Sequence, residues 1–299
     1  MIDIEQVSKA YGQVQAVKNV SLRVNDGELF GLIGPDGAGK TTLFRMLVTL
    51  LIPDAGRATV QGLDIVSDYK KLRHIVGYMP GRFSLYQDLT IEENLQFFAT
   101  VFGTSLEANY DLVKDIYVQI EPFRTRRAGK LSGGMKQKLA LCCALIHKPE
   151  VLFLDEPTTG VDAVSRKEFW DMLKGLQQKG LTIVVSTPYM DEASLCDRVA
   201  LIQKGEVLAI DTPAGITKRF DKPLVAVKSV ETYRLIQDLR QAPFTHSCYA
   251  FGEYLHVALS QGVAPEHIQA YLHERQHQGI EVMPINAGIE DCFMDLITS

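Results

Sequence analysis

Two patterns of apolar residues divide the first two-thirds of the chain. Apolar and polar positions alternate over 2–7 and 14–24, as they do in strands with one exposed face. The segments 29–33, 151–154 and 182–185 are instead almost continuously apolar, which favours strands buried on both faces of a parallel sheet. The sequence therefore predicts an α/β core with a parallel sheet and a small antiparallel sheet attached to it.

A turn signal stands between these two kinds of strand. Asn25-Asp26-Gly27 follows the alternating segment 14–24 and precedes the apolar segment 29–33. Asp-Gly between two such runs is a hairpin signal, so we expect the chain to form a hairpin at this point.

Apolar residues recur at helical spacing after residue 89. Two such series precede a third helix that begins near Ser132, whose side chain is a candidate N-cap. Series of this kind usually form the core face of a helix, so we expect a structural helical lobe over about 89–135. The two series are Ile91, Leu95, Phe98 and Val101, and Leu112, Ile116 and Ile120.

Pro213 ends this pattern, and a different one begins at Leu224. The later segment predicts the order strand, helix, strand, strand, helix, strand, which is typical of a small α+β module of the ferredoxin-like type. We therefore expect two domains, over 1–215 and 216–299. The predicted elements of the second are strands over 224–230, 247–251, 254–259 and 280–283 and helices over 232–239 and 265–277.

A glycine-rich loop between the strand 29–33 and a helix is the strongest chemical signal in the chain. Its glycines allow the backbone to aim successive N–H groups inward, and the following helix adds its positive N-terminal end. A triphosphate would be cradled there, with Lys40 reaching its terminal phosphates and the Thr41 hydroxyl holding Mg²⁺. The loop residues are Gly34, Pro35, Asp36, Gly37, Ala38, Gly39, Lys40, Thr41 and Thr42.

Two further segments could meet this ligand. The buried strand 151–154 ends in Asp155-Glu156, and adjacent carboxylates at such a position are costly unless they meet a cation or hydrogen-bond donors. A metal-bound triphosphate would supply both. Ser132-Gly133-Gly134 opens a helix and could bind an anion, although such a sequence is more often only a flexible turn.

The totals exclude several classes of protein. The 299 residues are 46% hydrophobic, enough for one large or two modest cores, and a formal net charge of −5 argues against a nucleic-acid-binding protein. The start of the chain lacks the features of a signal peptide, and the longest apolar run is far shorter than the about 20 residues that cross a membrane. We expect a soluble, cytoplasmic chain whose five cysteines, without disulfide or zinc spacing, are reduced.

A metal site in the second domain is a weaker alternative. His273 and His277 stand one helical turn apart and could share a metal, but the sequence suggests no third ligand. A solvated helix face is the simpler interpretation of this pair.

Taken in order, the loop 34–42, the segment 131–135 and the strand 152–156 resemble the three motifs of an ATP-binding cassette (ABC) ATPase. The resemblance covers residues 1 to about 215. The continuation Met135-Lys136-Gln137 and the tail 288–296 resemble the drug- and sodium-export type of cassette in particular.

The resemblance implies a role for each motif. Tyr11 is similar to the aromatic residue that stacks on adenine, and residues 34–42 would bind the phosphates with Mg²⁺. Asp155 would hold the metal through water, and Glu156 would be the general base for the attacking water. Ser132, Gly133 and Gly134 resemble the signature segment that closes over ATP bound to a partner cassette.

Three positions depart from the family pattern. Gly81 stands where the family has a glutamine that approaches Mg²⁺ and the water, and Pro188 stands where it has the switch histidine. Proline offers neither a side-chain hydrogen bond nor a backbone donor. Asp36 replaces an uncharged residue of the loop, so its carboxylate should face away from the phosphates.

The departures predict a cassette that binds MgATP but hydrolyses it poorly. As an exporter subunit, it would drive a separate membrane permease and sit at the inner face of the membrane. A homodimer would contain two impaired sites, so we expect a heterodimer or a second cassette fused beyond Ser299. The alternatives are a non-catalytic regulatory cassette and a soluble ABC protein that acts on ribosomes or DNA.

Overall fold

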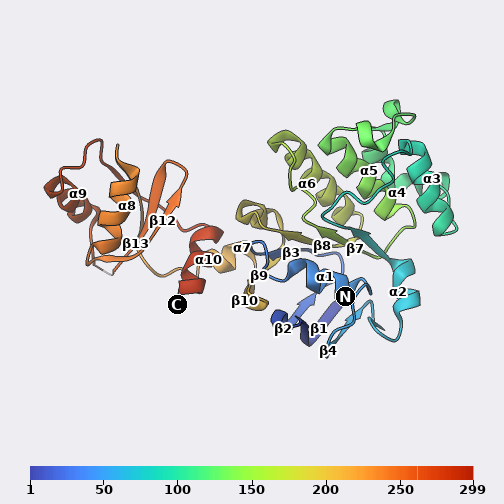
Figure 1. Ribbon diagram of the computed structural model, residues 1–299, viewed down its shortest axis with the longest axis horizontal. Helices are drawn as coiled ribbons and strands as arrows, with labels where there is room; N and C mark the ends of the chain where they lie inside the picture. The colour runs from blue at the N-terminus through green and yellow to red at the C-terminus, as the bar shows by residue number, and fades with distance from the viewer. Residues whose placement is uncertain (261, 299) are drawn as a thin grey trace. The chain divides into compact units, whose positions relative to one another are not determined.

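The computed structural model describes residues 1–260 and 262–298. Gln261 and Ser299, both inside the expected second domain, lie outside the described residues. The chain divides into two compact units, Met1–Pro213 and Ala214–Ser299. The first unit contains two sheets and the second contains one (Figure 1). Each unit has its own apolar core.

A six-stranded sheet forms the centre of the first unit. Five of its strands run parallel, and only the edge strand β10 is antiparallel to its neighbour. The strands β3, β7 and β8 are buried along their whole length, which confirms the parallel sheet predicted from the apolar runs. In spatial order the strands are β10 (Glu206–Asp211), β9 (Arg198–Gln203), β3 (Leu29–Ile33), β8 (Thr182–Thr187), β7 (Val151–Asp155) and β6 (Val76–Met79).

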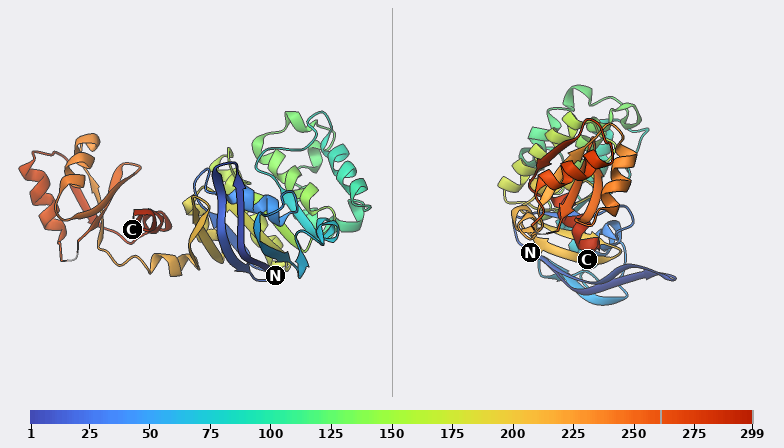
Figure 2. Two further views of the ribbon diagram at one scale, coloured as in Figure 1. Left: turned by 60° about the horizontal axis from the view of Figure 1, so that its bottom comes forward. Right: turned by 90° about the vertical axis from the view of Figure 1, so that its left-hand side faces the viewer.

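A second, antiparallel sheet lies beside it and uses the alternating segments. Its long strands β1 (Ile2–Tyr11) and β2 (Val14–Val24) pair with each other (Figure 2), and β1 also pairs with β4 (Ala55–Val60). The short strand β5 (Leu63–Asp64) completes the sheet. The hairpin predicted at Asp26-Gly27 is therefore wrong: the chain turns there, but β2 and β3 belong to different sheets.

Helices cover the parallel sheet and form a lobe at one side of the first unit. Helix α1 packs on β7 through an edge-to-face contact between Phe44 and Phe153, whose ring centroids are 5.5 Å apart. The predicted helical lobe is present, and its helices α3 and α4 both contact α5. The helices of this unit are α1 (Lys40–Leu47), α2 (Tyr69–Ile75), α3 (Ile91–Val101), α4 (Tyr110–Tyr117), α5 (Gly133–Leu145) and α6 (Ala163–Gln178), and α7 (Pro213–Thr217) begins on its last residue.

The second unit has one antiparallel sheet in the order β12-β13-β11-β14. Helices α8 and α9 pack against this sheet and close an apolar core. Along the chain the elements follow the βαββαβ order expected from the sequence. They are β11 (Leu224–Lys228), α8 (Thr232–Gln241), β12 (Thr245–Phe251), β13 (Tyr254–Leu259), α9 (Pro265–Glu274) and β14 (Glu281–Pro284), followed by α10 (Ile289–Thr298).

The interpretation of His277 as part of a solvated helix face is wrong. Helix α9 ends at Glu274, and His277 is buried, with 4% of its surface exposed. Its Nε2 lies 2.8 Å from Asp238 Oδ2, and its Nδ1 lies 3.4 Å from Ser229 Oγ. Through these two contacts His277 ties Asp238 of α8 to Ser229, which directly follows β11. Among the described residues no cluster of three metal-ligating side chains occurs.

Candidate functional site

The parallel sheet brings the predicted site residues together at one edge. Strands β3, β8 and β7 are neighbours, with Ile33 opposite Thr187 and Asp155 opposite Ser186. Because parallel strands end at the same edge, the glycine-rich loop, Asp155-Glu156 and Pro188 all follow these strand ends. The edge therefore brings the loop together with two segments that follow it by more than a hundred residues in the sequence.

The glycine-rich loop leads into a helix whose first N–H groups have no side-chain cap. Gly39 is the N-cap of α1 and has φ +105°, a left-handed conformation in which a side chain would be strained. A Cβ at this position would also lie 2.2 Å from the Ala16 carbonyl oxygen. Glycine is therefore required here, and the free N–H groups of α1 can bind an anion.

Lys40 is held over the loop in a position to meet phosphate oxygens. Its Nζ donates hydrogen bonds to the carbonyl oxygens of Gly34 (2.8 Å) and Pro35 (3.1 Å). It also forms an ion pair with Glu156 Oε1 at 3.1 Å, and Lys40 is only 3% exposed. A buried ammonium with these partners is positioned before any ligand arrives.

Asp155 forms the second charged centre of the edge. It is 2% exposed and accepts hydrogen bonds from Ser186 Oγ (2.6 Å) and Thr41 Oγ1 (3.1 Å). A carboxylate and a hydroxyl on adjoining segments are oxygen ligands of the kind that Mg²⁺ prefers, so the predicted pair Thr41 and Asp155 fits this metal. Burial, together with the negative charge of Asp155, raises the pKa of Tyr78 to about 12, so this phenol stays neutral.

Glu156 has a strained backbone conformation. Its φ is +50°, which is uncommon for a residue with a side chain and is often found at functional sites. The backbone N–H of Glu156 donates a hydrogen bond to the carbonyl oxygen of Ser186 at 2.9 Å, and this bond holds the strained conformation in place. Within the described residues, Lys40 is the only cation paired with its carboxylate.

The two departures from the family pattern lie on either side of Glu156. A Cβ added to Gly81 would lie 3.0 Å from the Asp155 carbonyl oxygen and 3.7 Å from Glu156 Cβ, so a side chain here would enter the site. Pro188 directly follows β8 and contributes no polar hydrogen. Its neighbour Thr187 donates to the buried carboxylate of Glu192 at 2.6 Å, which fixes this segment.

Tyr11 lies near the loop, on the antiparallel sheet. It is the last residue of β1 and lies opposite Val14. Val14 is two residues before Ala16, whose carbonyl oxygen lies against Gly39 of the loop. The Tyr11 side chain is 47% exposed. An exposed ring in this position is available to stack on a base. Asp36 is also exposed.

The Ser132 segment packs near the start of α6 and not against the glycine-rich loop. Ser132 is the N-cap of α5, as predicted, and its Oγ accepts a hydrogen bond from Met135 N at 3.4 Å. A Cβ at Gly134 would lie 2.8 Å from Ser165 Oγ, and one at Gly133 would lie 3.8 Å from the Gly160 carbonyl oxygen. These glycines thus pack on the start of α6, and none of their close contacts is with the glycine-rich loop.

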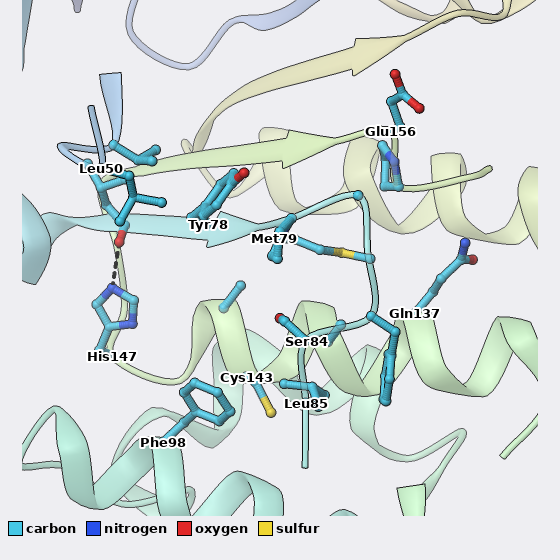
Figure 3. A pocket seen from close by; sticks show the side chains of 18 of the residues that line it. Leu50, Tyr78, Met79, Ser84, Leu85, Phe98, Gln137, Cys143, His147 and Glu156 are labelled. Carbon is cyan, nitrogen blue, oxygen red and sulfur yellow. Dashed lines mark hydrogen bonds between the residues drawn. The ribbon is translucent and has the colours of Figure 1, made fainter. Parts of the chain in front are cut away.

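A cavity of about 810 Å³ opens between the sheet and the helical lobe. Its lining is largely apolar, with Leu85, Phe98 and Phe102 among its residues, and it reaches Glu156 at one side and Leu50 at the other (Figure 3). Two polar atoms in its lining are buried without a hydrogen-bond partner, Gln137 Oε1 and His147 Nδ1.

The sequence reasoning missed Ser186 and this cavity. Ser186 follows the apolar run of β8, and its hydroxyl both donates to Asp155 and accepts from the Glu156 N–H at 3.2 Å. A hydroxyl residue at the end of a buried parallel strand, next to a strand that ends in carboxylates, is the signal that could have identified it. The cavity depends on packing between the lobe and the sheet, which no local pattern encodes.

Comparisons with known proteins agree with this geometry. The sequence profile of the family described as "ABC transporter" matches residues 17–159. "Nod factor export ATP-binding protein I" of Burkholderia lata is 36% identical over 299 residues, which cover 99% of this chain and 96% of that protein.

The "Probable multidrug ABC transporter ATP-binding protein YbhF" of Escherichia coli K12 is 41% identical over 215 residues, or 71% of this chain. The matched segment spans only 37% of the length of YbhF. Among solved structures, the dimeric ATP-binding cassette MJ0796, in a post-hydrolysis state bound to ADP and Pi, has a TM-score of 0.64 at 26% identity and covers 71% of this chain and 98% of its own.

Proposed function

Because this chain belongs to the ABC transporter family, as an exporter-type ATP-binding subunit, we propose that it binds MgATP at its own loop and hydrolyses it slowly there. The observation that carries this proposal is the contrast along one sheet edge. The loop that would hold phosphate has its full set of contacts, while the positions beside Glu156 are a glycine and a proline.

Binding would use groups that are already positioned. The N–H groups of α1 and the Lys40 ammonium would meet the phosphates, and Tyr11 would stack on adenine. Thr41 and Asp155 would hold Mg²⁺, which when bound neutralises part of the phosphate charge. None of these groups depends on Gly81 or Pro188, so the affinity for ATP should be ordinary for a cassette.

Hydrolysis would depend on Glu156 accepting a proton from the attacking water. Ser186 and the strained conformation fix the backbone of Glu156, and Lys40 pairs with its carboxylate. A side chain at 81 and a donor at 188 would be needed to orient the water and stabilise developing charge. The loss of one such group typically lowers a rate by about 10²–10³-fold, and two are absent here.

The Ser132 segment would act on a partner. Its glycines pack on α6 rather than on the loop of the same chain, so it is available to close over ATP bound to a second cassette. Two copies of this chain would form two impaired sites. We therefore infer a partner cassette of different sequence, in a separate chain or a fused one, whose loop is completed by this signature segment.

The cavity between the sheet and the lobe would receive a membrane permease. Its floor is apolar, Leu50 and Val101 on its lining are more than half exposed, and Lys70, Arg73 and Lys136 also line it. A partner segment with an apolar face and acidic flanks would match this surface. Such a permease would supply the membrane part and keep this chain at the inner face of the membrane. Among the described helices, none has the length and apolar character of a membrane span.

We further assign ATP binding to residues 1–215 and an accessory role to 216–299. The two compact units support this division, and the sheet of the second unit involves none of the site residues. Deletion of residues after 215 should leave the affinity for ATP unchanged within about twofold.

The test separates binding from hydrolysis in the purified chain. Calorimetric titration should show MgATP binding, with phosphate release close to background. The double variant Gly81→Gln, Pro188→His should release phosphate at least about 10²-fold faster at unchanged affinity, whereas the matched control Gly81→Leu, Pro188→Ala should not. Rapid turnover by the unaltered chain that is lost in Glu156→Gln would refute the proposal.

A non-catalytic regulatory cassette is the second candidate, and the same two absent groups favour it. The assay that divides the candidates adds a hydrolysis-competent partner cassette. A transport subunit should increase the partner's ATPase rate through Ser132, whereas a regulatory cassette should leave this rate unchanged.

A further inference from the structure

Glu192 carries a buried carboxylate that the proposed function does not use. The residue lies in the short 3₁₀ helix Met190–Leu195, which follows β8, and it is only 1% exposed. Its Oε1 accepts a hydrogen bond from Thr158 Oγ1 at 2.7 Å, and its Oε2 accepts one from Thr187 Oγ1 at 2.6 Å. Both threonines are fully buried. Because a buried charge is costly, a carboxylate in this place needs an explanation.

The two threonines belong to segments that meet at Glu156. Thr158 is two residues after Glu156 along the chain, and Thr187 is the last residue of β8. Its neighbour Ser186 accepts the Glu156 N–H at its carbonyl oxygen (2.9 Å) and at its hydroxyl (3.2 Å). Two consecutive residues of β8 therefore hold Glu156 from both sides. Ser186 holds it directly, and Thr187 holds it through Glu192 and Thr158.

The backbone of Glu156 needs support on both sides. Its φ of +50° is an uncommon conformation, and such a conformation persists only where the surrounding structure determines it. Ser186 fixes the N-terminal side of the residue. With no tie on the C-terminal side, the turn that follows could relax, and the carboxylate would leave Lys40, with which it pairs at 3.1 Å.

A cation from α6 completes the surroundings of Glu192. Arg166 Nε lies 3.8 Å from Glu192 Oε1 and balances the charge of the buried carboxylate. The guanidinium carbon of Arg166 lies 4.4 Å from the centroid of the Tyr189 ring. The Tyr189 N–H also donates to Thr187 Oγ1 at 3.1 Å. The carboxylate is thus the centre of a network that joins the end of β8, the segment after Glu156 and the start of α6.

We propose that Glu192 is a positioning residue, which holds the proposed general base, Glu156, in its strained conformation beside the glycine-rich loop. It acts by joining Thr158 to Thr187, and it touches neither ATP nor the attacking water. The inference rests on the proposed role of Glu156 and adds the group that keeps this base in place. Since Thr187 directly precedes Pro188, the same bridge fixes the segment that carries one of the two departures from the family pattern.

Hydrogen–deuterium exchange of the full chain tests the bridge without depending on hydrolysis. Thr187→Val removes the hydroxyl that donates to Glu192, so the backbone amides of 156–161 should exchange about tenfold faster. Thr187→Ser keeps the hydroxyl and should behave like the unaltered chain. Thr182→Val is the matched control, because Thr182 is buried in the same strand and accepts a hydrogen bond from Gly27 N at 2.9 Å. It should leave the exchange of 156–161 unchanged.

A double-mutant cycle attributes this effect to Glu192. Glu192→Met has a similar volume without the carboxylate, and it should also raise the exchange of 156–161 by about tenfold. In the Glu192→Met chain, Thr187→Val should add less than about twofold, because the bridge is already broken. Effects that multiply would show that Glu192 does not link the two segments, and they would overturn the inference.

The rate of hydrolysis gives a second readout. In the chain carrying Gly81→Gln and Pro188→His, Thr158→Val should lower kcat for phosphate release by about tenfold and leave the KM for ATP unchanged. The reason is that Glu156 is displaced while the groups that bind ATP are not. Thr158→Ser keeps the hydroxyl and should keep the rate. If Thr158 only packed in the core, serine would be the more harmful change, because it loses the methyl group that valine retains.

The outcomes separate this inference from the proposed function. If Thr187→Ser speeds exchange as much as Thr187→Val, or if neither changes it, the bridge does not hold Glu156. The inference is then wrong while the proposed function stands. If the unaltered chain turns over ATP rapidly, or if Gly81→Gln with Pro188→His is no faster, the proposed function fails, and the exchange measurements still decide the role of Glu192.

Discussion

The phosphate loop (residues 34–42) and the hydrolytic edge beside it (Gly81, Asp155-Glu156 and Pro188) lie at the same end of the parallel sheet. They differ in how they are built. The loop relies on backbone N–H groups, one buried lysine and a hydroxyl, which the local fold positions together. The edge relies on individual side chains, and two of its positions are Gly81 and Pro188. We therefore expect binding to depend largely on the backbone and one lysine, and hydrolysis to depend on several individual side chains.

The two substituted positions also differ from each other. Gly81 lacks a side chain beside Glu156, and a Cβ there would lie 3.0 Å from the Asp155 carbonyl oxygen, so a larger residue at 81 requires a small shift of this backbone. Pro188 fills its position with a ring and removes a backbone donor, so nothing can take its place without displacing it. The comparison predicts that Gly81→Gln restores a side chain alone, whereas Pro188→His must restore a side-chain donor and a backbone donor together.

The largest expected effect comes from removing the proposed general base, Glu156, from a chain in which both substituted positions carry the family residues. In the chain carrying Gly81→Gln and Pro188→His, the further change Glu156→Gln should lower phosphate release by about 10²–10⁴-fold, because the proton acceptor is lost. The affinity for ATP should stay within a few-fold by calorimetry. A rate that survives would show that another residue is the base.

Loss of Lys40 should affect ATP binding by the phosphate loop, the other region of the comparison. Lys40→Met should weaken ATP binding by about 10²-fold, because a buried charged contact to the phosphates disappears. Lys18→Met is the matched control, since Lys18 pairs with Glu206 at the surface and should leave binding unchanged. Equal effects of the two variants in a titration would contradict the assignment of the loop.

The same contrast explains what the sequence could predict. Continuous apolar runs and the glycine-rich loop identified β3, β7 and β8 and the position of Lys40, because each feature is local. Asp26-Gly27 failed as a hairpin signal because the choice of sheet depends on distant strands. His277 failed because its burial comes from Asp238 and Ser229, which a helical spacing does not reveal.

The ring at the end of β1 should have a smaller effect than Lys40. Tyr11→Ala should raise the Kd for ATP by roughly tenfold, because stacking on one base contributes about 1–3 kcal/mol. Tyr11→Phe keeps the ring and should bind like the unaltered chain. If Tyr11→Ala binds normally, adenine does not lie against this ring.

The smallest effect concerns the cavity wall on the side of the helical lobe. Burial lowers the pKa of His147 below its usual 6.5, and the nearby His74 lowers it further. The folded state therefore disfavours the protonated ring. This contribution to the free energy of unfolding is complete above pH 6.5 and is lost as the pH falls through the folded pKa.

Urea unfolding followed by Trp170, the single tryptophan, should therefore show a lower stability at pH 5.5 than at pH 7.5. His147→Phe keeps the stack on Phe102 and should reduce this difference, while the exposed control His267→Asn should not. An unchanged difference in His147→Phe would mean that the ring is not held neutral by the fold. Since His147 also lines the cavity and its Nδ1 has no partner, acid should also weaken the binding of a hydrogen-bond donor at this atom.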